Sequence, residues 1–169
     1  ELIQSAQILE KCGAGIIAMP CNQAHFFLPQ IQKEITIPIL YVIEETCREL
    51  CETLPHAKKV GLIAALGTVH CGVYNRVLSR AGIEVLVPAN ADQNRIQDAI
   101  AQVKAGAQNR YTRETFQSIG KRLIEAGAEA VILGCTEVPL AFEPHQVNYL
   151  SIDSTRVLAE AAVDWALKE

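Results

Sequence analysis

The stretch at residues 9–21, LEKCGAGIIAMPC, aligns without gaps on residues 123–135, LIEAGAEAVILGC. The two stretches share their first leucine, a Gly-Ala pair in the middle and a final cysteine. Each is typical of a helix that stops at a glycine and is followed by a short apolar strand with a cysteine at its carboxyl end. We therefore predict two similar α/β halves whose strand ends line one cleft, with a chance match between two βα units as the alternative.

The rest of the chain alternates between strand and helix patterns, which indicates a parallel α/β architecture. Strands are expected at residues 37–42, 59–65, 84–87, 130–133 and 149–152, and helices at residues 2–13, 44–54, 74–81, 92–105, 112–126 and 155–168. The best linker candidate is Leu54-Pro55-His56. We predict one half at residues 1–55, to which residues 148–169 return, and a second half at residues 56–147.

The composition favours a globular protein that acts on a small molecule. Half of the 169 residues are apolar, which is enough for a real core. A net charge of −4 and the absence of any basic cluster argue against a nucleic-acid partner. The apolar runs are far shorter than the roughly 20 residues that cross a bilayer, so no membrane partner is expected. The six cysteines lie within strand and helix patterns rather than in a disulfide scaffold, so we expect a reducing cytoplasm.

Cys21 and Cys135 are the candidate reactive groups. Ligands of parallel α/β sheets bind beyond the carboxyl ends of the strands, where both cysteines are expected. The helix N-termini found there are expected to lower the pKa of each thiol, because the helix dipole favours the thiolate. Polar residues follow each cysteine, Asn22-Gln23 in one case and Thr136-Glu137 in the other. Two polar turns around one cleft are suited to gripping a carboxylate.

The other cysteines and the histidines have simpler interpretations. Cys12, Cys47 and Cys51 fall within helix patterns and are expected to be small core residues. Cys71 is expected near the cleft without a catalytic role. His25 follows Cys21 by one turn and either orients it or is a satisfied helix-start histidine, whereas His56 and His145 are expected to face solvent. Since no closely spaced Cys/His pair of the C-x-x-C or H-x-x-x-H type occurs, no metal site is expected.

Two stretches resemble the signature segments of the aspartate/glutamate racemase family: MPCNQAH at residues 19–25 and LGCTEVPL at residues 133–140. Supporting similarities are IPI at residues 37–39 with IEET at 43–46, GT at 67–68 with GVY at 72–74, and VKAG at 103–106. The resemblance spans essentially the whole chain. Glu137 resembles the aspartate-racemase branch, because the glutamate-racemase branch commonly has histidine at that place.

The resemblance implies racemisation of an acidic amino acid, aspartate first, without pyridoxal phosphate or any other cofactor. Cys21 and Cys135 would be paired acid/base groups on opposite faces of the substrate carbon. The implied substrate-binding residues are Asn22, Gln23, Ala24, Thr68, Lys104, Thr136 and Glu137. Taken by itself, Lys104 is more simply a favourable charge at a helix C-terminus. The family also implies a homodimer.

The chain departs from the family pattern in two ways. Gln23 stands where the family commonly has threonine. The family also begins with a strand, a glycine-rich loop and further βα material before the helix that starts at Leu2, so the N-terminal half looks incomplete. We therefore expect exposed apolar surface around the strand at residues 15–19, for unseen residues or a partner subunit to cover.

Two alternative functions stay open at the level of the sequence. One is another enzyme of the same fold family, namely a glutamate or hydantoin racemase, a maleate isomerase or a decarboxylase. The other is a non-catalytic protein that binds an amino acid in the same cleft.

Overall fold

The computed structural model describes residues 1–168, and its centre is a parallel sheet of four strands in the order β4-β3-β5-β6. The strands are β3 (Lys59–Ile63), β4 (Glu84–Leu86), β5 (Ala130–Leu133) and β6 (Ser151–Asp153). Every residue of β5 is buried, as expected for an apolar strand that is covered on both faces of a parallel sheet. The predicted parallel α/β architecture is confirmed.

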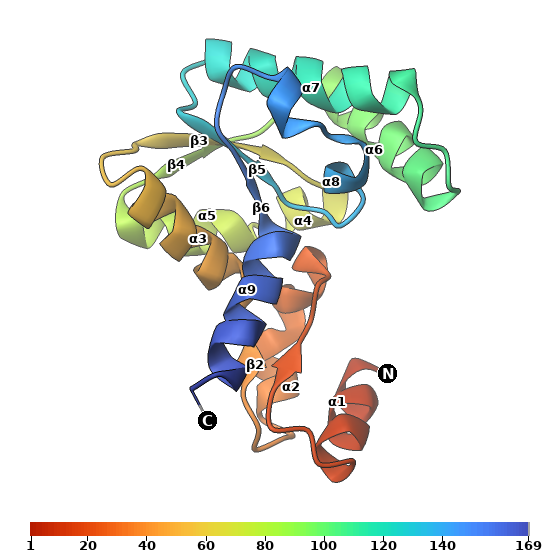
Figure 1. Ribbon diagram of the computed structural model, residues 1–169, viewed down its shortest axis with the longest axis vertical. Coiled ribbons are helices and arrows are strands. Elements are labelled where there is room, and N and C mark those ends of the chain that lie inside the picture. Colours follow the sequence, from red (N-terminus) through yellow and green to blue (C-terminus); the bar gives the residue numbers. More distant parts are fainter. Residues whose placement is uncertain (169) are drawn as a thin grey trace.

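Two layers of helices cover the two faces of this sheet (Figure 1). On one face, α6 (Asn90–Lys104) packs against α7 (Arg110–Glu125), and on the other α3 (Val42–Thr53) packs against α5 (Val73–Leu78). Successive strand residues alternate between the layers, so that Ile132 packs with α3 and α5 while Leu133 packs with α6 and α7. The carboxyl ends of the strands are left between the layers, where ligands of such sheets bind.

A smaller unit carries a second parallel sheet of two strands, β1 (Ile17–Ala18) and β2 (Ile39–Leu40). Around it lie α1 (Leu2–Lys11), the 3-10 helix η1 (Asn22–Phe27) and α2 (Leu28–Gln32). Figure 1 shows α9 (Ser154–Ala166) running from the end of β6 toward this unit, where α9 contacts β1 and β2. Of residues 148–168, which were expected to return to the first half, β6 extends the four-stranded sheet and α9 contacts β1 and β2.

The elements that the sequence pattern did not predict are all short. They are η1, α2, α4 (Leu66–His70), α8 (Val138–Ala141) and η3 (Pro144–Gln146), whereas η2 (Ser79–Ala81) lies within the helix expected at residues 74–81. A segment of one or two turns shows too few repeats for helical periodicity to be recognised. Three of them, η1, α4 and α8, begin within five residues of the end of a strand and so lie at the carboxyl edge of the sheets.

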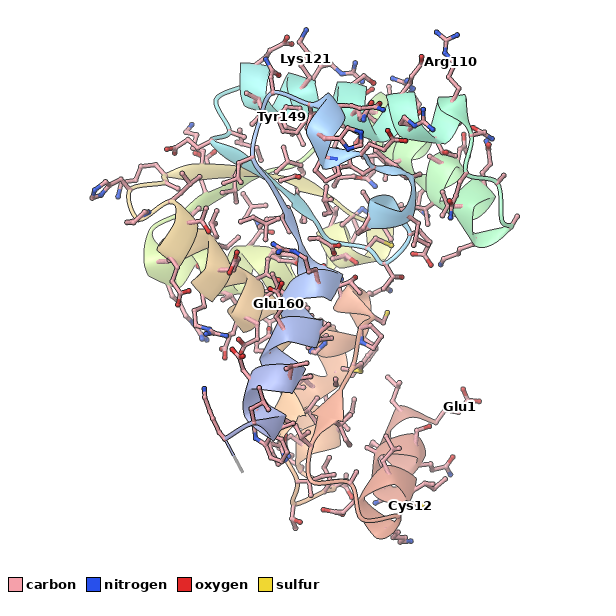
Figure 2. All side chains as sticks on the ribbon, in the orientation of Figure 1. Glu1, Cys12, Arg110, Lys121, Tyr149 and Glu160 are labelled. Carbon is pink, nitrogen blue, oxygen red and sulfur yellow. The ribbon has the colours of Figure 1, made fainter. Side chains whose placement is uncertain are left out.

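The predicted apolar surface around β1 is present. Ala18 is exposed, and on α1 the side chains of Ile8 and Leu9 are 60% and 45% exposed. An apolar hollow of about 180 Å³ opens between α1 and β1. Cys12, expected in the core, is instead exposed at the far end of the molecule (Figure 2). The reason is that α1 buries only Ala6, so most of its surface has no packing partner within the described chain.

None of the helices in residues 1–168 combines the length and the hydropathy that are needed to cross a bilayer.

Candidate active site

Cys135 lies in a tight turn that directly follows β5. A side chain on the preceding Gly134 would meet Leu62 Cδ1 at 2.8 Å and the ring of Tyr74 at 3.2 Å, so only glycine allows this close approach. The Cys135 thiol donates a hydrogen bond to Glu137 Oε2 over 2.9 Å, and the Thr136 hydroxyl donates to the same oxygen over 3.0 Å. The carboxylate of Glu137 therefore orients both side chains.

The surroundings of Cys135 hold it as a thiol. Burial and the hydrogen-bonded Glu137 carboxylate raise the pKa of the Cys135 thiol to about 12. Our expectation of a lowered pKa at this position is wrong, because the adjacent carboxylate and the loss of water disfavour the thiolate. For Glu137, partial burial acts to raise the pKa, but the hydrogen bonds from Cys135 and Thr136 outweigh it and lower the pKa.

Lys104 contacts the same carboxylate from the end of α6. Its Nζ lies 4.0 Å from Glu137 Oε1, and its side chain is 61% exposed. This cation lowers the pKa of Glu137 and acts, as a smaller influence, to lower that of Cys135. Lys104 is therefore both a favourable charge at the C-terminus of α6 and a neighbour of the Glu137 carboxylate.

Cys21 lies in the corresponding turn after β1 but in different surroundings. It is exposed and stands at the N-cap of η1, where its carbonyl accepts a hydrogen bond from the Ala24 amide over 3.1 Å. His25 is buried, with Nε2 2.8 Å from the Met19 carbonyl and its ring stacked on Tyr41. The contact of His25 with the main chain before Cys21 favours the structural interpretation of this histidine.

A buried chain of side chains joins the two cysteine turns. The Asn22 amide donates from Nδ2 to Ser154 Oγ over 3.1 Å, and the Ser154 hydroxyl donates to the Leu133 carbonyl over 2.8 Å. Asn22 directly follows Cys21, and Leu133 stands two residues before Cys135. The structure therefore brings the turn after β1 to the carboxyl ends of β5 and β6.

A further contact joins the Cys21 turn to the segment after β3. The amide of Gln23 packs so closely on Gly67 that a side chain at position 67 would overlap it, with 2.4 Å to Gln23 Nε2. Gly67 and the buried Thr68 belong to α4, which contacts η1. Cys71 closes this helix, and its thiol donates to the Thr68 carbonyl over 3.4 Å. Cys71 therefore lies at the end of the helix that contacts η1.

Most of the predicted site residues thus gather at one edge, but their side chains differ in accessibility. Gln23 is exposed, whereas Ala24, Cys135, Thr136 and Glu137 are half-buried. Asn22 and Thr68 are only 3% and 2% exposed. A hollow of about 740 Å³ lies elsewhere, beside Lys121 and Tyr149 (Figure 2). It contains none of the predicted site residues.

Sequence reasoning missed Ser154 and Tyr74. Ser154 follows β6 immediately, as Gly134 follows β5, so the strand-end rule alone was a sufficient signal for it. Tyr74 donates from its hydroxyl to Asn22 Oδ1 over 2.6 Å, which no sequence pattern indicates. His56 and His145 are exposed, as expected. Within residues 1–168, no three His, Cys, Asp or Glu side chains are grouped so as to hold a metal ion.

Two cysteine-bearing turns at the carboxyl edge of parallel sheets define an α/β protein with a candidate thiol site. Comparison with known proteins gives the family: residues 1–162 match Asp/Glu/Hydantoin racemase, and the chain belongs to this family. The resemblance of the two signature segments is confirmed.

Three relatives indicate the range of activities in the family. The broad specificity amino-acid racemase RacX of Bacillus subtilis is 31% identical over 96% of this chain and 69% of its own length. The glutamate racemase of Aquifex pyrophilus is 29% identical over 82% of this chain, which spans only 52% of that protein. The solved structure of the Picrophilus torridus aspartate racemase is 28% identical, with a TM-score of 0.81 over 98% of this chain and 68% of that one.

Proposed function

We propose that this protein racemises an acidic amino acid, aspartate first, by a cofactor-independent mechanism with two bases, Cys21 and Cys135. The observation that carries the proposal is the buried link between the turn after β1 and the end of β5, which places the two thiol-bearing turns at one edge. Racemisation needs two proton carriers on opposite faces of the α-carbon, and Cys21 and Cys135 each follow the carboxyl end of a strand, β1 in one case and β5 in the other.

The two cysteines enter the reaction in different protonation states. Cys135, whose pKa is raised to about 12, is the thiol that delivers a proton. Cys21 acts as the thiolate that removes the α-proton from the opposite face. After one turnover Cys21 carries a proton and Cys135 is the thiolate, so the product enantiomer finds the roles reversed. Glu137 and Lys104 influence the stability of the state in which Cys135 is the thiolate. Glu137 opposes negative charge on Cys135, and Lys104 favours it.

Negative charge spreads onto the α-carboxylate as the proton leaves, and this charge needs hydrogen-bond donors. Gln23 and Thr136 are the accessible polar side chains beside the two cysteines, and Lys104 adds a cation at the rim. Each well-placed donor contributes about 3 kcal/mol to lowering the barrier. Asn22 and Thr68 are buried, so we assign their contribution to main-chain groups and to packing.

A broader substrate range is the second candidate function. It is favoured by the similarity to RacX, a broad specificity amino-acid racemase, and by Gln23 in the place of the common threonine. The substrate side chain would then be held less selectively than in an aspartate-specific enzyme. We propose the homodimer of the family as the assembly, to be checked by light scattering on the complete protein.

Solvent-deuterium exchange tests the proposal most directly. The complete protein is incubated in D₂O with single enantiomers of aspartate, glutamate and several neutral amino acids, and α-deuterium and chirality are followed separately. Exchange and inversion with aspartate or glutamate support acidic-substrate racemisation, and equal rates with neutral amino acids support the broad range. Calorimetric binding of aspartate without any exchange would identify a non-catalytic binding protein and contradict the proposal.

A further inference from the structure

A directed chain of hydrogen bonds runs through the buried region between the cysteine turns. Tyr74 Oη donates to Asn22 Oδ1, Asn22 Nδ2 donates to Ser154 Oγ, and Ser154 Oγ donates to the Leu133 carbonyl. The distances are 2.6, 3.1 and 2.8 Å in that order. Every hydroxyl uses its one proton in this chain, so the order of donors and acceptors fixes the orientation of the Asn22 amide.

This hydrogen-bond chain lies in the core, where apolar side chains could take the place of polar ones. Tyr74, Asn22 and Ser154 are 1%, 3% and 0% exposed, and Tyr74 packs with apolar core residues of α3, α5 and β5. Burial raises the pKa of the Tyr74 hydroxyl, so it stays protonated and available as a donor. A buried polar chain costs desolvation that apolar side chains would not incur, and such networks specify one alignment of the elements they join.

This hydrogen-bond chain joins the elements that carry the two cysteines. Asn22 adjoins Cys21 at the start of η1, and Leu133 ends β5 two residues before Cys135. Tyr74 touches both ends, because its ring lies 3.2 Å from the position of a side chain on Gly134 while its hydroxyl bonds Asn22. Ser154, the first residue of α9, completes the bridge.

We propose that Tyr74, Asn22 and Ser154 are positioning residues that hold the Cys21 turn in register with the Cys135 turn, without touching the substrate through their side chains. The inference rests on the proposed two-cysteine racemisation and assigns to Asn22 a role different from the one its sequence position implied. Proton transfer on two faces of one carbon is sensitive to the placement of both sulfurs. The chain therefore sets the turnover number and leaves substrate affinity nearly unchanged.

The test compares two tyrosines that each donate one hydrogen bond. Tyr74→Phe removes only the hydroxyl that bonds Asn22, and Tyr149→Phe removes a hydroxyl that bonds the Gln117 carbonyl of α7 over 3.0 Å and takes no part in the hydrogen bonds between the cysteine turns (Figure 2). In the complete protein, Tyr74→Phe is expected to lower kcat by about tenfold to a hundredfold with KM changed by less than about threefold. Tyr149→Phe is expected to leave both within about twofold.

Ser154→Ala breaks the same chain at its other end and serves where Tyr74→Phe lowers the melting temperature too far for an assay. The double variant Tyr74→Phe/Ser154→Ala is expected to lose no more activity than the poorer single variant, because the chain acts as one unit. A folded Tyr74→Phe protein with kcat within about twofold of the unmodified protein would overturn the proposal. So would fully additive effects in the double variant.

A second measurement needs no catalysis and separates this inference from the proposed function. Dibromobimane bridges neighbouring thiols, and peptide mass spectrometry reports the yield of the bridge between Cys21 and Cys135. The yield is expected to fall in Tyr74→Phe and to be unchanged in Tyr149→Phe. If the unmodified protein exchanges no α-proton of any amino acid, the proposed function fails while the bridging comparison still decides the positioning role. An equal yield in all three proteins would overturn that role.

Discussion

The two cysteine turns start from the same local sequence pattern and end in different chemical surroundings. Cys135 follows a strand at the centre of a four-stranded sheet, is half-buried and donates a hydrogen bond to Glu137. Cys21 follows a strand of a two-stranded sheet, is exposed, and has a buried histidine one turn further along the chain. The repeat places both cysteines after strand ends, and burial with the neighbouring carboxylate raises the pKa of Cys135.

This difference suits a reaction that needs one acid and one base at the same moment. Two thiols in equal surroundings would ionise alike, and much of the protein would then carry either two thiols or two thiolates. Burial, together with a carboxylate beside only one thiol, removes that symmetry, since the two raise the pKa of Cys135 to about 12. The predictions below test how far the asymmetry governs function, beginning with the largest expected effect.

Replacing either cysteine by serine removes one of the two proposed proton carriers. Cys21→Ser or Cys135→Ser is expected to lower interconversion of the enantiomers by about 10³-fold or more, because serine ionises too weakly to serve as a base. Each variant is expected to keep slow α-proton exchange for one enantiomer only, and for opposite enantiomers. At neutral pH the exchange left in Cys21→Ser is the slower one, since Cys135 is then the only base and its pKa is about 12.

Deuterium incorporation followed by chiral separation measures these rates, with Cys12→Ser as the control because Cys12 is exposed at the far end of α1. A variant of Cys21 or Cys135 that racemises at nearly the unmodified rate removes that cysteine from the mechanism. Loss of both exchanges with one replacement and of neither with the other would indicate a single base.

Removing the carboxylate tests the cause of the asymmetry. In Glu137→Gln, the loss of the adjacent negative charge is expected to lower the pKa of Cys135 from about 12, while burial keeps it above the ordinary value of 9.0. Each unit of lowering raises the thiolate fraction near pH 8 about tenfold, and the rate of alkylation by iodoacetamide rises with it.

Mass spectrometry of the Cys135 peptide gives this rate, and Glu143→Gln is the matched control because Glu143 pairs with Arg113 instead. An unchanged alkylation rate at Cys135 in Glu137→Gln would mean that burial alone sets its pKa.

The contact of Gln23 with Gly67 tests whether the exposed turn binds the substrate. In Gly67→Ala the new methyl group displaces the Gln23 amide, which is the end of a flexible, exposed side chain. We expect a KM several-fold higher, kcat within about twofold and a stability change below about 0.5 kcal/mol.

Gly61→Ala is the informative control, because its methyl group would meet Leu123 Cβ at 2.9 Å inside the core. It is expected to cost about 1–3 kcal/mol of stability and to leave KM unchanged. If Gly67→Ala leaves KM unchanged as well, Gln23 has no part in holding the substrate.

Much of the fold was predictable because the long elements carry clear periodicity. The strand at residues 130–133 was predicted at its exact bounds, and the helices α6 and α7 within two residues. The short helices at the strand ends were not predicted, since a few residues show no helical periodicity and tertiary contacts set their geometry. The positions of both cysteines followed from the strand-end rule.

The chemistry around the cysteines was less predictable for a physical reason. A helix N-terminus was expected to favour both thiolates, but burial and a carboxylate two residues after Cys135 raise the pKa of that thiol instead. The bond from Tyr74 to Asn22 joins residues that are 52 positions apart, and no local pattern predicts such a pairing. Sequence therefore located the candidate site, and tertiary contacts determined its electrostatics.

The smallest expected effect concerns His25, the group that has no counterpart in the Cys135 turn. Burial lowers the pKa of His25, and its contact with the Met19 carbonyl only partly offsets this. Because the folded protein disfavours the protonated ring, the unfolded chain binds this proton more readily near pH 6.5 and below. The free energy of unfolding should therefore be fully maintained above pH 6.5 and fall as the pH decreases, by at most about 1.4 kcal/mol per pH unit from this group.

His25→Gln, which can still donate to the Met19 carbonyl, is expected to flatten this dependence in urea unfolding between pH 7.5 and about pH 5.5. His56→Gln is the control, because His56 is exposed. If His25→Gln and the unmodified protein lose equal stability over this range, the Cys21 turn does not depend on a neutral His25, and the histidine does not distinguish the two turns.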